Sequence, residues 1–296
     1  MKPAPFDHVA ATSVLEAAQV LESAVFVGHE AKVLAGGQSL VPLMALRLAR
    51  PAILVDVNRV AELHGVETGA AGTVRVGATT RHAELARQRA HPLLAEAARH
   101  IGHTAIRTRG TFGGSLAHAD PAAELPLVAS ATAAVLELAS ARGARRVAAA
   151  DFFESTFSTA LAEDELLVAA TVAVPTRWGF AEFARRHGDF ALVAAVVAEV
   201  GGRFRVRVGG VAPVPWAATA AEDILAGAPA ADARPLAEVA ARDLAAAAGA
   251  AAGAEVDPGD DIHAPAAYRR ALTAELVARA VRDALSRPPS RPEVAP

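Results

Sequence analysis

The sequence predicts an α+β protein in which short strands and helices are mixed. Apolar runs that end at a polar residue or a proline, such as Ile53 to Val57 and Val168 to Val174, are typical of strands. Apolar residues at helical spacing, as in Pro92 to His100 and Ala266 to Leu285, are typical of helices. Because these segments do not follow a regular βα repeat, the pattern favours the α+β class over a parallel α/β fold.

Residues 1–58 are expected to form a small α/β subdomain of a larger domain that ends at residue 177. The segment Ser13 to Glu22 has helical periodicity, and Ser13 and Glu16 have the spacing of a capping box. Val33 to Ala35 and Ile53 to Val57 are the expected strands. Strand, helix and strand in so short a distance indicate one compact α/β unit.

Residues 59–177 are expected to form a larger α+β subdomain. Val74 to Ala78 predicts a strand and Thr80 to Arg87 a short helix. Ala129 to Leu138 is an apolar run without a clear period, and Asp151 to Phe157 is expected to be a loop or a short helix. Pro175 to Gly179 marks the expected domain boundary.

Residues 178–286 are expected to form a C-terminal domain, followed by a flexible tail over 287–296 that contains four prolines. Its expected strands are Ala181 to Arg185 and Phe204 to Val208, and Ala191 to Val200 reads as a strand or a buried helix. Its other expected helices are Ala217 to Leu225 and Arg234 to Ala248.

Composition excludes several kinds of function. The 296 residues carry a net charge of -3, so no overall positive field favours nucleic acid or an anionic membrane. The sequence shows no apolar stretch of about 18 residues and no signal peptide, so a cytoplasmic protein is expected. Cysteine is absent, which excludes a cysteine-ligated iron–sulfur cluster in this chain. Redox chemistry would therefore need a bound organic cofactor, and any cluster would belong to a partner.

Two glycine clusters are the candidate binding motifs. The first strand-like run ends at Gly36-Gly37 and continues through Gln38-Ser39 into an apolar segment, and the second cluster lies within Arg107 to Asp120. Paired glycines allow close backbone approach to an anion, and free amides at a helix start point toward negative charge. A phosphorylated cofactor is therefore expected, although Gly36-Gly37 alone could be an ordinary turn. Neither cluster matches a dinucleotide fingerprint or a P-loop.

Taken together, Ala35 to Ser39 (A-G-G-Q-S) and Thr111 to Ser115 (T-F-G-G-S) resemble the FAD-binding medium subunit of molybdenum hydroxylases, the family of aerobic carbon monoxide dehydrogenase and the xanthine dehydrogenases. Further stretches resemble the same family in the same order: Leu46 to Val57, Arg107 to Pro126, Arg185 to Ala191, Gly209 to Pro213 and Asp261 to Arg270.

This resemblance implies a fold and a set of partners. The fold would be a two-subdomain FAD-binding unit of the PCMH, vanillyl-alcohol-oxidase-like type, followed by a C-terminal domain with a small antiparallel sheet and helices. The chain would hold FAD, while a large molybdopterin-binding subunit would hold the molybdenum cofactor and a small iron–sulfur subunit two [2Fe–2S] clusters. The family expectation is a dimer of heterotrimers that passes electrons to an external acceptor. No catalytic side chain and no metal site is expected in this chain.

The resemblance also implies which residues surround FAD. The two loops would hold the pyrophosphate, Asp120 and Glu124 would accept hydrogen bonds from ribityl or ribose hydroxyls, and Phe190 would lie on the flavin ring. The full expected set is Leu34, Ala35, Gly36, Gly37, Gln38, Ser39, Leu40, Thr111, Gly113, Gly114, Ser115, His118, Asp120, Glu124 and Phe190.

Each side chain has a simpler interpretation. Asp120 could cap a helix before Pro121, Glu124 could be a solvated acid in a first helical turn, and Phe190 could be a core residue. His118 could be a packing or hydrogen-bonding residue. Two other functions stay open at this point: a stand-alone flavin oxidase of the vanillyl-alcohol-oxidase type, and a scaffold subunit that has lost its flavin.

Overall fold

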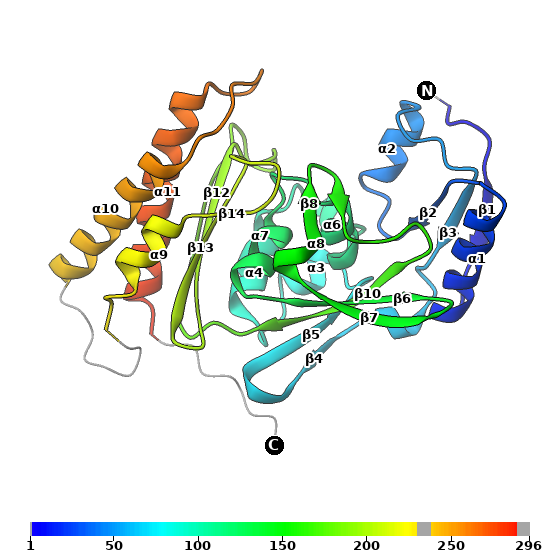
Figure 1. Cartoon of the computed structure of the whole chain (residues 1–296), viewed down its shortest axis with the longest axis horizontal. Helices are drawn as coiled ribbons and strands as arrows, with labels where there is room; N and C mark the ends of the chain where they lie inside the picture. The colour runs from blue at the N-terminus through cyan, green and yellow to red at the C-terminus, as the bar shows by residue number, and fades with distance from the viewer. Residues whose placement is uncertain (1, 230–237, 289–296) are drawn as a thin grey trace.

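The described residues form three β-sheets of three to five strands, each accompanied by helices, and one separate two-stranded hairpin (Figure 1). The computed structural model describes residues 2–229 and 238–288. The predicted α+β class is confirmed, because strands and helices are mixed without a regular βα repeat. Residues 234–237 of one expected helix and residues 289–296 of the expected tail lie outside the described residues.

The N-terminal sheet has three parallel strands in the order β1-β3-β2. Helix α1 packs against it, and α2 follows β2 directly. The bounds are β1 (Asp7–Ala10), α1 (Val14–Phe26), β2 (Ala31–Leu34), α2 (Leu40–Ala45) and β3 (Ile53–Asp56).

The capping box predicted at α1 is present in a modified form. The Ser13 hydroxyl accepts a hydrogen bond from the amide of Glu16 at 3.1 Å. The Glu16 carboxylate reaches back one residue further than expected and accepts from the amide of Thr12 at 2.7 Å. The amide of Glu16 in the first turn and the amide of Thr12 before the helix therefore both have acceptors.

The second sheet has five antiparallel strands in the order β4-β5-β10-β6-β7. Its strands are β4 (Val66–Thr68), β5 (Thr73–Gly77), β6 (Val135–Ser140), β7 (Gly143–Ala148) and β10 (Leu166–Ala173), and a small hairpin adds β8 (Phe153–Ser155) and β9 (Ser158–Thr159). Its helices are α3 (His82–Leu85), α4 (Pro92–His100), α5 (Thr104–Arg107), α6 (Phe112–His118), α7 (Glu124–Ala131) and α8 (Ala149–Phe152), and short 3-10 turns lie at Ala61–Leu63 and Ala70–Gly72.

The third sheet has four antiparallel strands in the order β11-β12-β13-β14, and three helices cover one of its faces (Figure 1). The bounds are β11 (Trp178–Phe183), β12 (Val193–Val200), β13 (Arg203–Gly209), β14 (Trp216–Ala217), α9 (Thr219–Leu225), α10 (Glu238–Glu255) and α11 (Ala266–Ser286).

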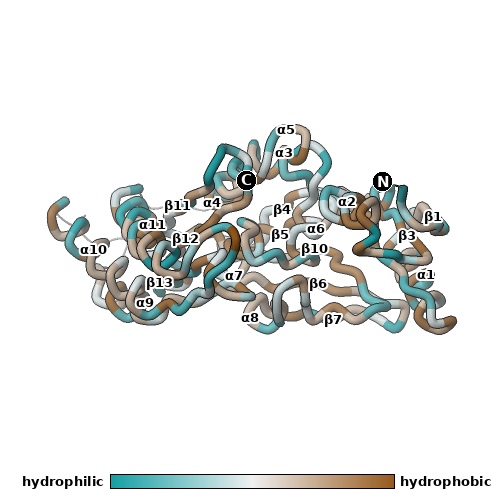
Figure 2. The backbone as a smooth tube through the Cα atoms, turned by 90° about the horizontal axis from the view of Figure 1, so that it is seen from above, coloured by the Kyte–Doolittle hydropathy of each residue, from teal (hydrophilic) through white to brown (hydrophobic). Residues whose placement is uncertain are grey.

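Helices α4 and α7 lie between the two antiparallel sheets and join them through one core. The largest apolar cluster includes Phe112 and Leu125 from the helices and Phe180 and Val196 from the third sheet. In Figure 2 the molecule is elongated, with the N-terminal sheet at one end and α10 at the other. The two glycine loops lie where the N-terminal subdomain contacts the subdomain of the five-stranded sheet.

Three segments differ from their sequence-based expectation. Ala129 to Leu138 divides into the end of α7, a turn in which Ala133 has a φ of 50°, and β6. Asp151 to Phe157 contains the end of α8 and the strand β8, instead of a loop or short helix alone. The helix predicted over Arg234 to Ala248 ends too early, because α10 continues to Glu255. Apolar runs carry no period, so they do not locate such breaks.

Candidate functional site

The first glycine loop carries a run of free amides. Among the described residues, no protein acceptor takes the amide hydrogens of residues 36–40. Gly37 has a φ of 69°, a conformation that favours glycine, and Ser39 begins α2 without a side-chain cap. Gly36 is buried and the other four residues are partly exposed. Consecutive free amides at a helix start are suited to binding an anion.

The second glycine loop is arranged differently, because its amides bond within the protein. Phe112 donates to the carbonyl of Thr80 at 2.9 Å, and Gly113 to that of Ala78 at 2.8 Å. The Thr111 hydroxyl caps α6 by accepting from the amide of Gly114 at 3.1 Å. This loop therefore offers an anion the partly exposed surface of Gly114 and Ser115, not a row of free amides.

The two loops lie against each other. A Cβ added to Gly36 would come within 2.4 Å of the carbonyl oxygen of Arg109 and 2.7 Å of Cα of Gly110. A Cβ on Gly114 would lie 3.9 Å from Cβ of Ala35. Residues separated by more than seventy positions thus form one surface, as the convergence of the two motifs requires.

The buried residue His82 holds the second loop through two hydrogen bonds. The Nε2 of His82 lies 2.8 Å from the carbonyl oxygen of Thr111, and the His82 amide donates to the carbonyl of Gly110. Burial lowers the pKa of His82 to about 4, so the ring is neutral at pH 7. A neutral ring that donates from Nε2 holds Thr111 in place.

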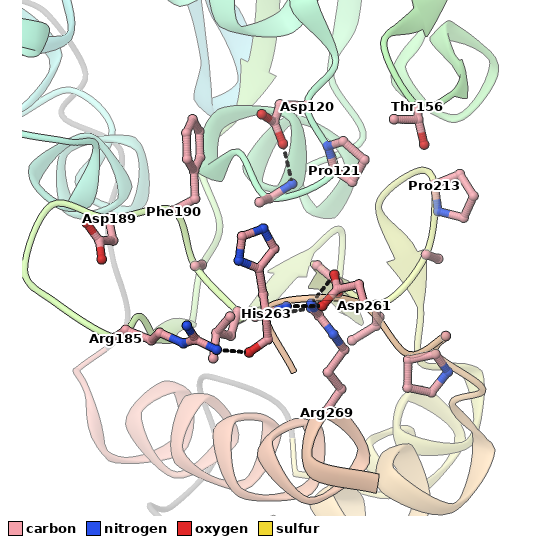
Figure 3. Close-up of a pocket in the computed structure, with 18 of the residues that line it drawn as sticks. Asp120, Pro121, Thr156, Arg185, Asp189, Phe190, Pro213, Asp261, His263 and Arg269 are labelled. Atoms are coloured by element: carbon pink, nitrogen blue, oxygen red, sulfur yellow. Dashed lines mark hydrogen bonds and ion pairs between the residues drawn. The ribbon is translucent and has the colours of Figure 1, made fainter. Parts of the chain in front are cut away.

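A pocket of about 770 Å³ opens near the far end of α6 (Figure 3). The residues after α6 and four other chain segments form its wall, and they include stretches that carry the family resemblance. The lining residues that matter here are Asp120, Thr156, Arg185, Phe190, Pro213, Asp261, His263 and Arg269. Helix α6 begins at the second glycine loop and ends two residues before Asp120, which spans about 10 Å.

Arg269 fixes the floor of this pocket. Its guanidinium is buried and donates to the carbonyl oxygens of Leu192 and Gly210, at 2.7 and 2.6 Å. It also donates to Asp261 at 2.6 Å, which holds the pKa of that carboxyl below its usual range. Three loops of the C-terminal sheet and helices therefore meet at one side chain.

Phe190 and Asp120 lie at the pocket. Phe190 is 71% exposed, so the interpretation as a core residue is wrong. Asp120 accepts a hydrogen bond from the amide of Ala122 at 2.9 Å and does not cap α7, which begins at Glu124. His118 is half-buried against Phe157, with ring centroids 4.8 Å apart.

Glu124 is buried, so the interpretation as a solvated acid is wrong. Burial, and then the charge of Glu182, raise its pKa to about 8. Glu182 contacts His100 at 3.4 Å through Oε1, and among the described residues its buried Oε2 has no partner. The hydrogen bond that His100 donates to Glu182 raises the pKa of His100. Glu124 therefore carries a proton at pH 7.

The structure adds residues that sequence reasoning passed over. The His263 side chain extends into the pocket in Figure 3, and Arg269 lies beneath it. Both belong to Asp261 to Arg270, a stretch that carries the family resemblance. The sequence therefore marked this stretch but did not assign a role to either side chain. Asn58 and Arg81 connect the two glycine loops, and no local motif marks either of them.

The fold and this geometry define a protein with two subdomains that meet at a pair of glycine loops, one of them lined with free amides. Residues 4–177 match the FAD binding domain in molybdopterin dehydrogenase, and residues 178–284 match the CO dehydrogenase flavoprotein C-terminal domain. The chain therefore belongs to the family of FAD-binding medium subunits of molybdenum hydroxylases, and it is an oxidoreductase subunit.

Relatives cover nearly the whole chain. The 6-hydroxypseudooxynicotine dehydrogenase complex subunit alpha of Paenarthrobacter nicotinovorans is 40% identical over 97% of this chain and 97% of its own length. The carbon monoxide dehydrogenase medium chain of Hydrogenophaga pseudoflava is 35% identical over 97% of this chain and 99% of its own. A chain of quinoline 2-oxidoreductase from Pseudomonas putida 86 superimposes with a TM-score of 0.86 at 36% identity, covering 96% of this chain and 98% of that one.

These findings confirm the predicted family and the predicted FAD-binding fold with a C-terminal domain. No helix of the described residues is both long and apolar enough to cross a membrane.

Proposed function

We propose that this chain is the electron-transfer subunit of a heterotrimeric molybdenum hydroxylase. It would accept electrons from two [2Fe–2S] clusters on a small partner and deliver them to an external acceptor, while a large molybdopterin-binding partner carries out the hydroxylation. The absence of cysteine supports this division, because the chain has no thiolate for such a cluster. The names of its relatives as medium chains and complex subunits support it too.

The observation that carries the proposal is the run of free amides at residues 36–40 beside the second loop. A diphosphate carries about two negative charges, and amides at a helix start can bind it without a lysine cluster. We assign this role to Gly36, Gly37, Gln38, Ser39 and Leu40, with Leu34 and Ala35 leading into the loop. From the second loop, Gly114 and Ser115 face the same surface, while Thr111 and Gly113 hold its shape.

The pocket beyond α6 is the proposed site of the flavin ring. Its volume of about 770 Å³ lies within the usual range for cofactor sites. The exposed face of Phe190 would cover the ring, and Asp120 lines the pocket. His118 ends α6, and Glu124 begins α7 just beyond Asp120. Protonated Glu124 can donate as well as accept a hydrogen bond. When bound, FAD supplies one- and two-electron redox chemistry, which no side chain of the chain provides.

The direct test is reconstitution of the purified full chain with FAD. We expect a stoichiometric flavin absorbance spectrum that persists through gel filtration. The copurified complex should then show flavin bleaching when substrate is added anaerobically. A chain that fails to retain FAD would contradict the proposal. Oxidation of an alcohol with formation of hydrogen peroxide by the isolated chain would instead support a stand-alone flavin oxidase.

A further inference from the structure

Two polar side chains, Asn58 and Arg81, connect the two glycine loops. The Nδ2 of Asn58 donates to the carbonyl oxygen of Ala35 at 2.8 Å, directly before the first glycine pair. The guanidinium of Arg81 donates to Oδ1 of Asn58 at 2.8 Å and to the carbonyl oxygen of Arg109 at 2.6 Å, directly before the second loop. A continuous chain of hydrogen bonds therefore runs from one loop to the other.

This connection joins two different sheets. Asn58 follows β3 of the parallel sheet, and Arg81 lies between β5 of the antiparallel sheet and α3. Asp56 orients Asn58, because its Oδ1 accepts from Nδ2 of Asn58 at 2.7 Å and from the Asn58 amide at 2.9 Å. A backbone bridge between Arg81 and Thr111 orients the arginine. Each side chain is thus fixed by its own sheet and reaches toward the other.

The geometry of the peptide unit gives the connection a consequence for the free amides. In a trans peptide the carbonyl oxygen of one residue and the amide hydrogen of the next point in opposite directions. When Asn58 holds the carbonyl of Ala35, it also sets the direction of the Gly36 amide, the first of the five free donors. When Arg81 holds the carbonyl of Arg109, it fixes the segment against which Gly36 packs.

We propose that Asn58 and Arg81 are positioning residues that set the direction of the Gly36 amide and the spacing of the two loops. The proposal rests on the proposed function, because the ligand whose affinity depends on that spacing is FAD. Arginine suits this task, since its planar fork can donate to two fixed acceptors at once. The residues act through the loops and need no contact with the cofactor.

The test is a double-mutant cycle on FAD affinity with Asn58→Ala, Arg81→Gln and the combined variant of the full chain, measured by quenching of flavin fluorescence. We expect each single variant to bind FAD about 10- to 100-fold more weakly, the usual loss for a hydrogen bond with a charged partner. The double variant should be no weaker than the worse single one, because either change breaks the same connection. Arg75→Gln is the matched control, since it removes a part-buried arginine pair with Glu137 away from both loops.

Two outcomes would overturn the proposal. Unchanged FAD affinity in both single variants would show that the connection is dispensable. Losses that add in the double variant would show that the residues act separately, for example with Arg81 as a direct phosphate ligand. Asn58→Asp adds a finer test, because it keeps the acceptor for Arg81 and loses the donor to Ala35, so it should resemble Asn58→Ala.

A measurement without FAD separates this proposal from the proposed function. In the FAD-free chain, hydrogen exchange at the hydrogen-bonded amides of Val41 and Leu43, directly after the first loop, and of residues 112–115 should become faster in Asn58→Ala and Arg81→Gln but not in Arg75→Gln. Unchanged exchange at these amides would refute the positioning role even if the wild type binds FAD. Faster exchange in a chain that never binds FAD would instead refute only the proposed function.

Discussion

Single residues decide how closely the two loops approach. Gly36 has no unusual φ, so its requirement for glycine comes from the backbone of Arg109 and Gly110 and not from its own conformation. Gly37 is the opposite case, because its φ of 69° itself favours glycine. The two neighbouring glycines are therefore required for different reasons, close packing at Gly36 and a positive φ at Gly37. The sequence pattern alone does not distinguish them.

Replacement of Gly36 by alanine should separate the loops. The added Cβ meets backbone atoms at 2.4 and 2.7 Å, and backbone cannot rotate away as a side chain can. We expect a destabilisation of about 1–3 kcal/mol, the usual cost of overpacking, and a loss of FAD affinity of at least about tenfold. Thermal unfolding and FAD titration measure these effects.

Gly227→Ala is the control for this substitution, because the new Cβ would have only an ordinary contact of 3.7 Å with Ile224. It should leave FAD affinity at the wild-type value. Wild-type affinity in Gly36→Ala as well would mean that the loops need not touch for binding.

At the scale of elements, α6 connects the loop to the pocket, and its start depends on Thr111. The family resemblance places Thr111 in a loop that would hold the pyrophosphate, and in the structure the Thr111 hydroxyl caps the helix. Threonine is common both at helix caps and beside bound anions. A capping hydroxyl accepts a hydrogen bond from an amide at the helix start, which is the position that an anion would otherwise occupy. Residue type and spacing therefore located the loop but did not identify the bond.

Thr111→Ala should destabilise the chain even without FAD. Loss of an N-cap hydroxyl costs about 0.5–2 kcal/mol, and we expect a value near 1 kcal/mol here. Thr111→Ser keeps the hydroxyl and should recover most of that stability. Denaturant unfolding of the FAD-free chain measures the difference between the two variants. Equal stability of the alanine and serine variants would show that the cap contributes nothing.

The elements that sequence predicted well are those with a period or a strong end signal. The helix Pro92–His100 has its predicted bounds, because proline opens it and the apolar spacing continues to its end. The prediction for Ala191 to Val200 stayed ambiguous between strand and helix, since both faces of β12 are covered and no polar residue interrupts its apolar run until Glu199. Asn58 and Arg81 had no signal, because their partners are backbone carbonyls from distant segments.

At the scale of the whole molecule, the buried titratable groups lie where elements pack together, and they make stability depend on pH. His91 is fully buried at the start of α4, where it accepts from the amide of Leu94, and its Nε2 lies 3.0 Å from the carbonyl oxygen of Ala173. Burial lowers its pKa to about 4, as it does for His82. Glu124 is the opposite case, with its pKa raised to about 8.

These shifts predict a maximum of stability near pH 6.5 for the FAD-free chain. Between about pH 4 and 6.5 the unfolded chain binds protons at His82 and His91 that the folded chain does not, so stability rises with pH. Between about pH 4.5 and 8 the folded chain keeps a proton on Glu124 that the unfolded chain releases, so this group opposes the rise and dominates above pH 6.5. The raised pKa of His100 acts in the same direction above pH 6.5.

Below pH 6.5 the two buried histidines increase stability with pH and the one buried carboxyl decreases it. The net slope of the unfolding free energy therefore corresponds to about one proton, or about 1.4 kcal/mol per pH unit. Denaturant unfolding from pH 5 to 8 measures this profile. Glu124→Gln should reduce the decrease in stability above pH 6.5, since a neutral amide has no proton to release on unfolding. His91→Asn keeps a capping side chain but removes about one proton from the slope, so most of the increase in stability below pH 6.5 should be lost. A profile that is flat from pH 5 to 8 in the wild type would contradict the assignment of these buried groups.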